Sequence, residues 1–506
     1  MKNIFSLFIL FILAALLVLS SCAKKLDINP RQSIADDVAL TNAQGINNAI
    51  NSVYAALKAS SLYGRDLVVI SEALGDRAFS NGKGNRFVNE NQNTVNAPFG
   101  FWGAAYGALN EINLILEAIP GVTTDAATRS RWEGELGFLR ALLHFDLAIT
   151  YAYIPSFTVA AQDKGNVVLA TKGFKTAEIS INYFPTRATH AAVYGQIMSD
   201  IYKAVSQLSN SNRGAYYASK LSALALGSRV ALYEGNWVRA DSFATAAITL
   251  GGIGAITTTA NHVSGWRTAL NPESIFEVRI ATLNEVPTIP NGLQGALTNL
   301  VTVGNNTTSN GGFGPLVPNL RLLTDLGISF TPAPNASTLS FGASIPAIAR
   351  GNDVRNQLFE IGPNVSGRHI ECTKFMGKNG APGVDNVPVL RWAELYLNRA
   401  EARSKLSTPD IAGANSDLNF IKTRRITGFT VPANLTGTAL TDEITLQRSL
   451  EFAFEGYRWF DMKRWGLPIV KTTPAVNLPN TTHRYNNQIP TAEVDGNKNM
   501  VQNFGY

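Results

Sequence analysis

Two pairs of glutamates have the residue type and helical spacing that could hydrolyse a glycosidic bond. Glu394 and Glu401 lie two turns apart on one face of an expected helix, and Glu451 and Glu455 are four residues apart. Glycoside hydrolases use two carboxyl groups about 5–10 Å apart. Arginines such as Arg391 accompany the glutamates, however, so ion pairs on or between helices are the favoured interpretation. A secreted glycoside hydrolase is the alternative.

The sequence shows no other signature of catalysis or metal binding. No histidine has a second histidine or a cysteine at ligand spacing; the five histidines are His144, His190, His262, His369 and His483. Cys372 lacks the local signature of a nucleophile, and we expect it to be buried and structural. The glycines at Gly82 and Gly252 lack the spacing of a phosphate loop or a dinucleotide fingerprint. We therefore expect no metal, no cofactor and no catalytic residue.

Two loop regions carry side chains that could bind a ligand without changing it. Residues 77–101 are rich in Asn and Gly and too long for a plain connector, and long ordered loops usually carry function. Sugar rings stack their apolar faces on aromatic side chains, and their hydroxyl groups pair with amides. The candidate ligand-binding residues are Phe87, Asn89, Asn91, Phe99 and Phe313. Packing of these side chains within their own loops is the alternative.

The first 22 residues have the pattern of an export signal that ends at a lipid-modified cysteine. Lys2 precedes an apolar run over residues 4–19, and Ser20, Ser21 and Cys22 follow, which resembles the lipobox of bacterial lipoproteins. The run is short for a helix that crosses a membrane. We expect residues 1–21 to be a cleaved signal peptide, Cys22 to be lipidated and residues 22–34 to be a tether. An uncleaved anchor or an ordinary signal is the alternative.

Composition indicates a globular body. Hydrophobic residues make up 45% of the 506 residues and charged residues 16%, which excludes a disordered chain. The formal charge is +6 and the basic residues are scattered, so we expect no nucleic-acid partner. Cys22 and Cys372 are the two cysteines, so acylation of Cys22 leaves no intramolecular disulfide.

Apolar residues at spacings of three and four predict a mainly α fold. The expected helices cover residues 43–57, 102–116, 132–153, 189–208, 220–234, 237–249, 389–405, 412–425 and 441–465, and a strand is expected near residues 274–280. Residues 220–249 and 389–425 form two helix hairpins with small residues where the helices meet, as in tetratricopeptide repeats. We expect an N-terminal helical region with binding loops over residues 35–270. The C-terminal region, 271–506, has a loop-rich insertion at 281–388 before helices at 389–465.

Several segments, in their order and spacing, resemble the SusD/RagB family of outer-membrane nutrient-binding lipoproteins. The sharpest are EFAFEGYRWFD at residues 451–461 and the ending at residues 489–506. Further matching segments lie at residues 21–30, 102–113, 138–147, 231–237 and 391–402. The resemblance therefore covers nearly the whole chain.

The resemblance implies a SusD-like scaffold of tetratricopeptide-like helix pairs with long loops and a few short strands. It also implies a non-catalytic lipoprotein, anchored in the outer membrane and facing outward, that serves nutrient uptake. Such a protein binds a polysaccharide, an oligosaccharide or another nutrient such as a peptide, and delivers it to a SusC-like TonB-dependent transporter. The shared motifs are scaffold residues, so they assign no ligand contacts. A tetratricopeptide-type scaffold for protein assembly is a further alternative.

Two features of this chain depart from the family pattern. Starch-binding members present an arc of Trp and Tyr side chains, but residues 281–350 contain neither type. Lipoproteins displayed on the surface often carry acidic residues directly after the lipidated cysteine, where this chain has Lys24 and Lys25. The first departure disfavours a starch-stacking site, and the second makes outward display a weaker expectation than anchoring.

Overall fold

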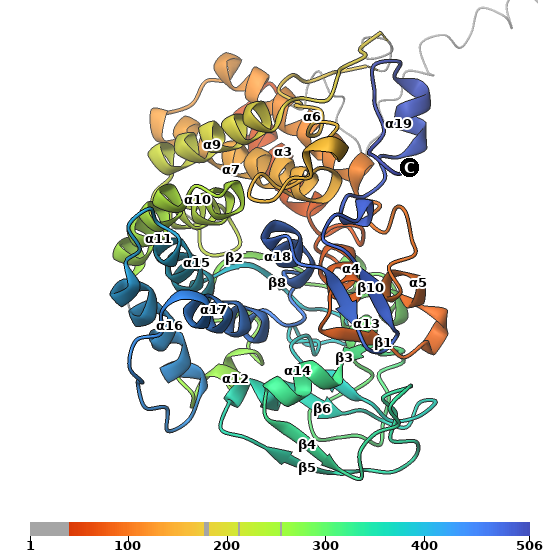
Figure 1. The fold of residues 1–506 in the computed structure, drawn as a ribbon. Coiled ribbons are helices and arrows are strands. Elements are labelled where there is room, and N and C mark those ends of the chain that lie inside the picture. The colour runs from red at the N-terminus through yellow and green to blue at the C-terminus, as the bar shows by residue number, and fades with distance from the viewer. Residues whose placement is uncertain (1–39, 177–181, 211–212, 253–255) are drawn as a thin grey trace, which may run out of the picture.

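The computed structural model describes residues 40–176, 182–210, 213–252 and 256–506 (Figure 1). The expected signal peptide, Cys22 and the tether lie outside these residues. The fold is mainly α-helical, as the sequence predicts. None of the helices in the described part of the chain is long and apolar enough to cross a membrane.

Long helices pack against one another in succession along one side of the molecule. They are α3 (Ala43–Ala56), α6 (Trp102–Ala118), α7 (Ala126–Tyr151), α9 (His190–Gln207), α10 (Lys220–Glu234), α11 (Trp237–Gly251), α15 (Trp392–Ser404), α16 (Ile411–Arg425) and α17 (Gly437–Glu451). Helices α7 and α9 pack together, and the contacts continue through α10, α11, α15 and α16 (Figure 1). The two expected hairpins, α10 with α11 and α15 with α16, are neighbours in this stack.

Local sequence signals explain where the first hairpin begins, turns and closes. Ser219 caps α10 through the backbone N–H of Ser222, and α10 ends at Gly235, whose φ of +79° suits a residue without a Cβ. The side chain of Asn236 then accepts a hydrogen bond from the N–H of Arg239 at the start of α11. Within the hairpin, a Cβ on Gly227 would lie 2.8 Å from the Phe243 ring. Glycine at this position therefore lets the two helices approach closely.

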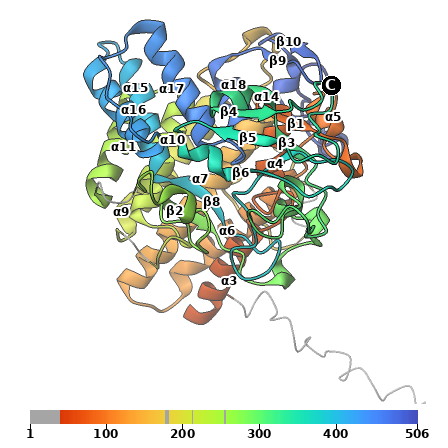
Figure 2. The ribbon, with the colours of Figure 1, turned by 90° about the horizontal axis from the view of Figure 1, so that it is seen from below.

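The strands described by the structure pair two at a time, all antiparallel. The pairs are β1 (Ala78–Ser80) with β3 (Leu316–Pro318), β2 (Ser274–Val278) with β8 (Val387–Arg391), β4 (Ile328–Thr331) with β5 (Ala347–Arg350), β6 (Phe359–Ile361) with β7 (Ile370–Cys372), and β9 (Ile469–Lys471) with β10 (Val476–Leu478). Figure 2 shows β1 and β3 on the side of the molecule away from α11, α15 and α16. The β1–β3 pair joins the 77–101 loop region to the 281–388 insertion.

The remaining helices are short. They are α4 (Asp66–Leu74), α5 (Val88–Asn91), α12 (His262–Gly265), α13 (Leu293–Leu297), α14 (Leu320–Asp325), α18 (Arg458–Trp465) and α19 (Thr491–Gly496). One hydrophobic cluster runs from Ile46 to Met500 and takes members from both expected regions. The boundary proposed between residues 270 and 271 stays a prediction.

Two expected helices are corrected by the structure. The helix expected over 389–405 begins only at Trp392, because residues 387–391 form strand β8 and pair with β2. The helix expected over 441–465 is broken into α17 and α18 by a turn in which Phe454 and Gly456 have φ of +63° and +86°. A Cβ on Gly456 would lie 2.8 Å from the carbonyl oxygen of Leu67, so close packing on α4 fixes this turn.

Candidate ligand-binding face

Four segments meet beside β1 and α13 and form the surface that we call the loop face: residues 81–90, 288–292, 303–314 and 362–368. Hydrogen bonds fasten the segments to one another. The side-chain amide of Asn81 donates to the carbonyl oxygen of Gly314 at 2.8 Å, and Lys83 Nζ donates to that of Gly367 at 2.8 Å. The loop face is therefore an ordered surface built from both halves of the chain.

Arg86 and Phe313 form the centre of the loop face. The Arg86 guanidinium lies over the Phe313 ring, 5.1 Å from its centroid, and its Nη2 donates to Asn291 Oδ1 at 2.7 Å. Arg65 Nη1 donates to the carbonyl oxygen of Asn291 at 2.8 Å. A Cβ on Gly84 would lie 3.2 Å from the Phe313 ring, so this glycine packs directly against it. The face thus presents a ring, an amide and a guanidinium group in fixed positions.

Three of the five residues expected from the sequence lie on this face. Phe87 is half-buried and has a φ of +56° just before α5. Asn89 is exposed, so its side chain faces solvent, and its backbone carbonyl oxygen accepts from the N–H of Thr94 at 3.0 Å. Phe313 is half-buried beneath Arg86. These three remain candidate ligand contacts.

The other two expected residues lie in the interior, which corrects their assignment. Asn91 is 1% exposed; its Oδ1 accepts from the N–H of Ser80 at 3.1 Å and its Nδ2 donates to the carbonyl oxygen of Ala73 at 3.0 Å. Phe99 is 2% exposed and stacks on Phe460 with ring centroids 5.9 Å apart. Both side chains hold the loop from within and do not reach a ligand on its surface.

Sequence reasoning missed the polar members of the loop face. Arg86 directly precedes Phe87 in the Asn- and Gly-rich segment, and a charged residue beside a candidate aromatic was a usable signal. Asn291 carried no such signal, because it reaches Arg86 only through the pairing of distant loops.

A buried carboxyl group supports the loop face from below. Glu371 Oε2 accepts from the N–H of Asn299 at 2.7 Å and from the Thr298 hydroxyl at 2.9 Å. Burial raises the pKa of Glu371 to about 7, although these hydrogen bonds and the charge of Lys83 act in the opposite direction. This residue orders the backbone at 298–300 beneath the exposed loops.

The glutamate pairs singled out from the sequence form buried ion pairs between elements. Glu394 meets Arg229 at 2.6 Å, and Glu401 meets Arg464 at 2.7 Å. Glu451 meets Arg425 at 2.9 Å, and one guanidinium group, Arg391, contacts both Glu451 and Glu455 at 3.0 and 2.7 Å. Burial opposes charge on Glu451, yet Arg425 and Arg391 hold its pKa well below the usual value. The interpretation of these glutamates as ion-paired structural residues is confirmed.

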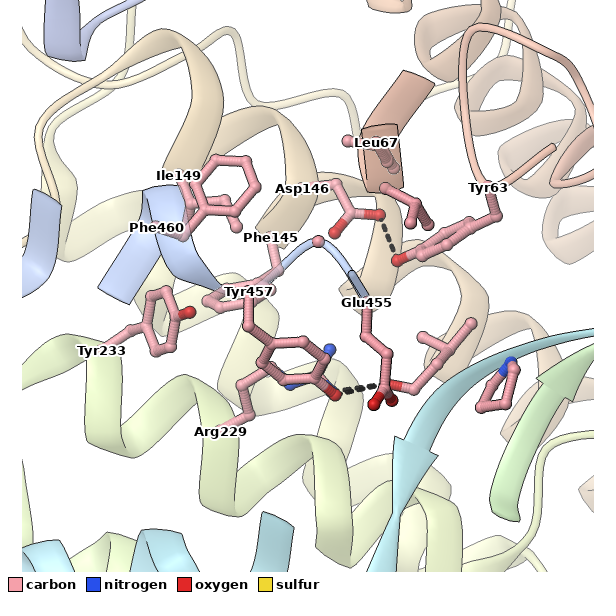
Figure 3. A pocket seen from close by; sticks show the side chains of 14 residues that line it. Tyr63, Leu67, Phe145, Asp146, Ile149, Arg229, Tyr233, Glu455, Tyr457 and Phe460 are labelled. Carbon is pink, nitrogen blue, oxygen red and sulfur yellow. Dashed lines mark hydrogen bonds between the residues drawn. The ribbon is translucent and has the colours of Figure 1, made fainter. Parts of the chain in front are cut away.

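An interior cavity of about 50 Å³ lies between α4, α7, α10 and the turn before α18 (Figure 3). Its lining includes Tyr63, Asp146, Arg229 and Tyr457. Tyr63 donates to Asp146 Oδ2 at 2.8 Å, and Arg229 is paired with Glu394. The space suits a few water molecules and is too small for a sugar ring. We interpret this cavity as part of the polar core.

The described residues contain neither a candidate metal site nor an exposed thiol. Within residues 40–176, 182–210, 213–252 and 256–506, no group of three or more His, Cys, Asp and Glu side chains could hold a metal ion. Cys372 is fully buried, and burial raises the pKa of its thiol to about 12. The expectation of a buried structural cysteine is confirmed.

The sequence matches two family models and two relatives over most of its length. The family model described as the SusD family matches residues 368–506, and the model described as starch-binding associating with outer membrane matches residues 25–232. The chain belongs to the SusD/RagB family. Two SusD-like proteins of Formosa agariphila, P2 and P38, are 23% and 24% identical to it; the alignments cover 89% and 92% of this chain and 88% and 91% of theirs.

Solved structures show the same SusD fold. A SusD superfamily protein from Bacteroides thetaiotaomicron has a TM-score of 0.75 and 24% identity, covering 91% of this chain and 99% of its own. A structure described as a putative sugar binding protein from Bacteroides vulgatus has a TM-score of 0.74 and 23% identity, covering 92% of this chain and 98% of its own. The helical scaffold of this SusD/RagB member is therefore that of its family.

Proposed function

We propose that this protein is a non-catalytic lipoprotein that binds a polysaccharide or oligosaccharide nutrient on the loop face. The observation that carries the proposal is the Arg86–Phe313 unit with Asn291, which fixes an aromatic ring beside hydrogen-bonding groups. The uncovered part of the Phe313 ring gives a sugar an apolar contact, and the guanidinium and amide groups beside it can pair with sugar hydroxyl groups. Phe87 and Asn89 extend this surface.

The descriptions of related proteins support carbohydrate as the ligand class. Two structures with this fold from Bacteroides vulgatus are described as a putative sugar binding protein and a SusD-like carbohydrate binding protein. The family model over residues 25–232 is described as starch-binding. Residues 281–350 contain neither Trp nor Tyr, so we favour a glycan that needs fewer stacking rings than starch.

Capture at the cell surface and delivery to a transporter complete the proposal. Cys22 would carry the lipid, the body would sit on the outer face of the outer membrane, and a SusC-like TonB-dependent transporter would receive the ligand. The lipobox-like sequence before Cys22 and the family description that names the outer membrane support this placement.

The two alternatives have less support. The glutamate pairs that suggested a glycoside hydrolase are buried and ion-paired, so they offer no free acid and base. The tetratricopeptide-like hairpins would allow a protein-assembly scaffold, but that role gives no reason for the ordered loop face.

A binding screen tests the proposal. Residues 23–506 are produced as a soluble protein and titrated with a panel of plant, algal and microbial glycans and a panel of peptides, with product analysis of every hit. Binding of a glycan without breakdown supports capture. Breakdown that survives purification would overturn the non-catalytic assignment, and binding of peptides alone would overturn the ligand class.

A further inference from the structure

A second cleft, distinct from the loop face, lies where the end of α3 meets strand β2. Its volume is about 160 Å³, more than three times that of the interior cavity. Asn51, Ala55 and Lys58 line it from the α3 side, and Tyr216, Tyr217 and Arg279 line it from the other elements. The volume is below the 300–1,000 Å³ of sites for drug-sized ligands, so it suits one monosaccharide unit and not a longer chain.

The two tyrosines of this cleft are held in place by neighbours. The Arg213 guanidinium lies 3.6 Å from the centroid of the Tyr217 ring, and the edge of Tyr54 meets the same ring with centroids 5.2 Å apart. The Tyr216 hydroxyl accepts from Asn386 Nδ2 at 3.1 Å. Both rings are half-buried, so each keeps surface for a ligand at little entropic cost.

Charge at the cleft favours an acidic ligand. Arg279 is exposed and lies over the Tyr216 ring at 5.3 Å, and Lys58 forms an ion pair with Glu285 at 2.5 Å. Glu277 also lines the cleft; its side chain is fully buried, and burial raises its pKa. Lys58 and Glu285 offset each other, so the exposed guanidinium group of Arg279 is the positive charge at the rim that favours an acidic ligand.

A short segment connects the cleft with the loop face. Glu285, the partner of Lys58, lies at the end of the 3₁₀ turn Leu283–Glu285, and the next turn, Ile289–Asn291, ends at the residue that binds Arg86. One saccharide chain lying along residues 283–291 would thus have the loop face at one end and the cleft at the other.

We propose that this cleft is a second saccharide subsite that takes a single uronic acid unit. The sugar ring contacts the exposed parts of Tyr216 and Tyr217, and its carboxylate faces Arg279 and Lys58. The inference rests on the proposed carbohydrate-binding function. It adds to that function a preference for acidic glycans and a contact away from the loop face.

Saturation-transfer NMR on residues 23–506 with methyl β-glucuronide, and with methyl β-glucoside as the neutral match, tests the subsite. Ala55 is exposed at the cleft, so Ala55→Phe fills it without removing a native contact. Ala246→Phe, at an exposed alanine of α11, is the matched control. We expect the glucuronide signal to exceed the glucoside signal, to fall at least tenfold in Ala55→Phe, and to persist in Ala246→Phe.

Further variants separate this proposal from the proposed function. Arg279→Gln should erase the preference for glucuronide, whereas Phe313→Ala should leave the glucuronide signal intact while weakening the binding of polymers. Equal signals from the two glycosides, a glucuronide signal unchanged by Ala55→Phe, or no signal from a protein that binds polymers would overturn the subsite alone. Failure of the wild-type protein to bind any glycan polymer would instead overturn the proposed function.

Discussion

The Arg86 guanidinium lies 5.1 Å from the centroid of the Phe313 ring and joins two loops that are far apart in the sequence. Because Arg86 also donates to Asn291, this one side chain links three loop segments, which further hydrogen bonds hold together as well. The ligand surface proposed here is therefore fixed before a ligand arrives, and preorganisation of this kind strengthens binding.

Replacing Arg86 by lysine tests the importance of that geometry. Lysine keeps the charge but lacks the planar guanidinium group, which lies over the Phe313 ring and also donates a hydrogen bond to Asn291. We expect the affinity for the glycan to fall five- to tenfold, about 1–1.4 kcal/mol, while the free energy of unfolding changes by less than about 0.5 kcal/mol. Calorimetric titration and denaturant unfolding measure the two quantities. An unchanged affinity in Arg86→Lys would contradict the role given to this residue.

Two asparagines in the same loop should respond in opposite ways. Asn91→Ala removes buried hydrogen bonds to backbone groups and should lower the free energy of unfolding by about 1–3 kcal/mol. Asn89→Ala changes an exposed side chain and should leave stability within about 0.5 kcal/mol while weakening glycan binding. Loss of stability in Asn89→Ala, or its absence in Asn91→Ala, would show that the loop is built differently.

The buried ion pairs should dominate the stability of the C-terminal half. Arg391→Met leaves Glu273, Glu451 and Glu455 with one cation fewer, and breaking a buried pair in this way costs about 3–5 kcal/mol. Arg321→Met is the matched control, because this arginine is exposed and the buried Asp76 that it meets at 3.3 Å keeps its ion pair with Arg458; the change should cost less than about 1 kcal/mol. Equal losses of unfolding free energy in the two variants, measured by urea unfolding, would argue against a stabilising ion-pair network around Arg391.

Asp146 should make stability depend on pH in the neutral range. Burial raises its pKa to about 7, so the folded protein holds a proton that the unfolded chain releases near pH 4. Its contribution to stability is therefore present below about pH 4 and is lost as the pH rises through 7, at about 1.4 kcal/mol per unit.

Asp146→Asn removes this titration while keeping an oxygen that can accept from Tyr63. Relative to wild type, the variant should gain stability steadily between pH 4.5 and 7. Urea unfolding at several pH values measures the difference, and a difference that stays constant with pH would refute the assignment.

Local sequence signals predicted the long helices well and the interrupted ones poorly. The bounds of α10 match the expectation exactly because Ser219 and Gly235 mark its ends. The strand before Trp392 was missed because its apolar residues fit a helical stripe equally well, and pairing with the distant strand β2 decided the outcome. The break at Gly456 depends on contact with α4, which periodicity does not reveal.

The candidate site was predictable as a region and not as a set of contacts. Composition located the 77–101 loop, but burial decided which of its side chains face outward. Phe99 looks like a loop aromatic in the sequence and becomes core because Phe460 packs on it. Asn291 joined the site only through long-range loop pairing, which no local pattern encodes.

The most direct test of the central claim compares wild type with Phe313→Ala in calorimetric titrations against the glycan found by the binding screen, while released reducing ends are measured in the same samples. The account predicts binding by wild type without new reducing ends, and an affinity at least tenfold weaker in a folded Phe313→Ala variant. Equal affinities in the two proteins, or steady release of reducing ends by wild type, would contradict it.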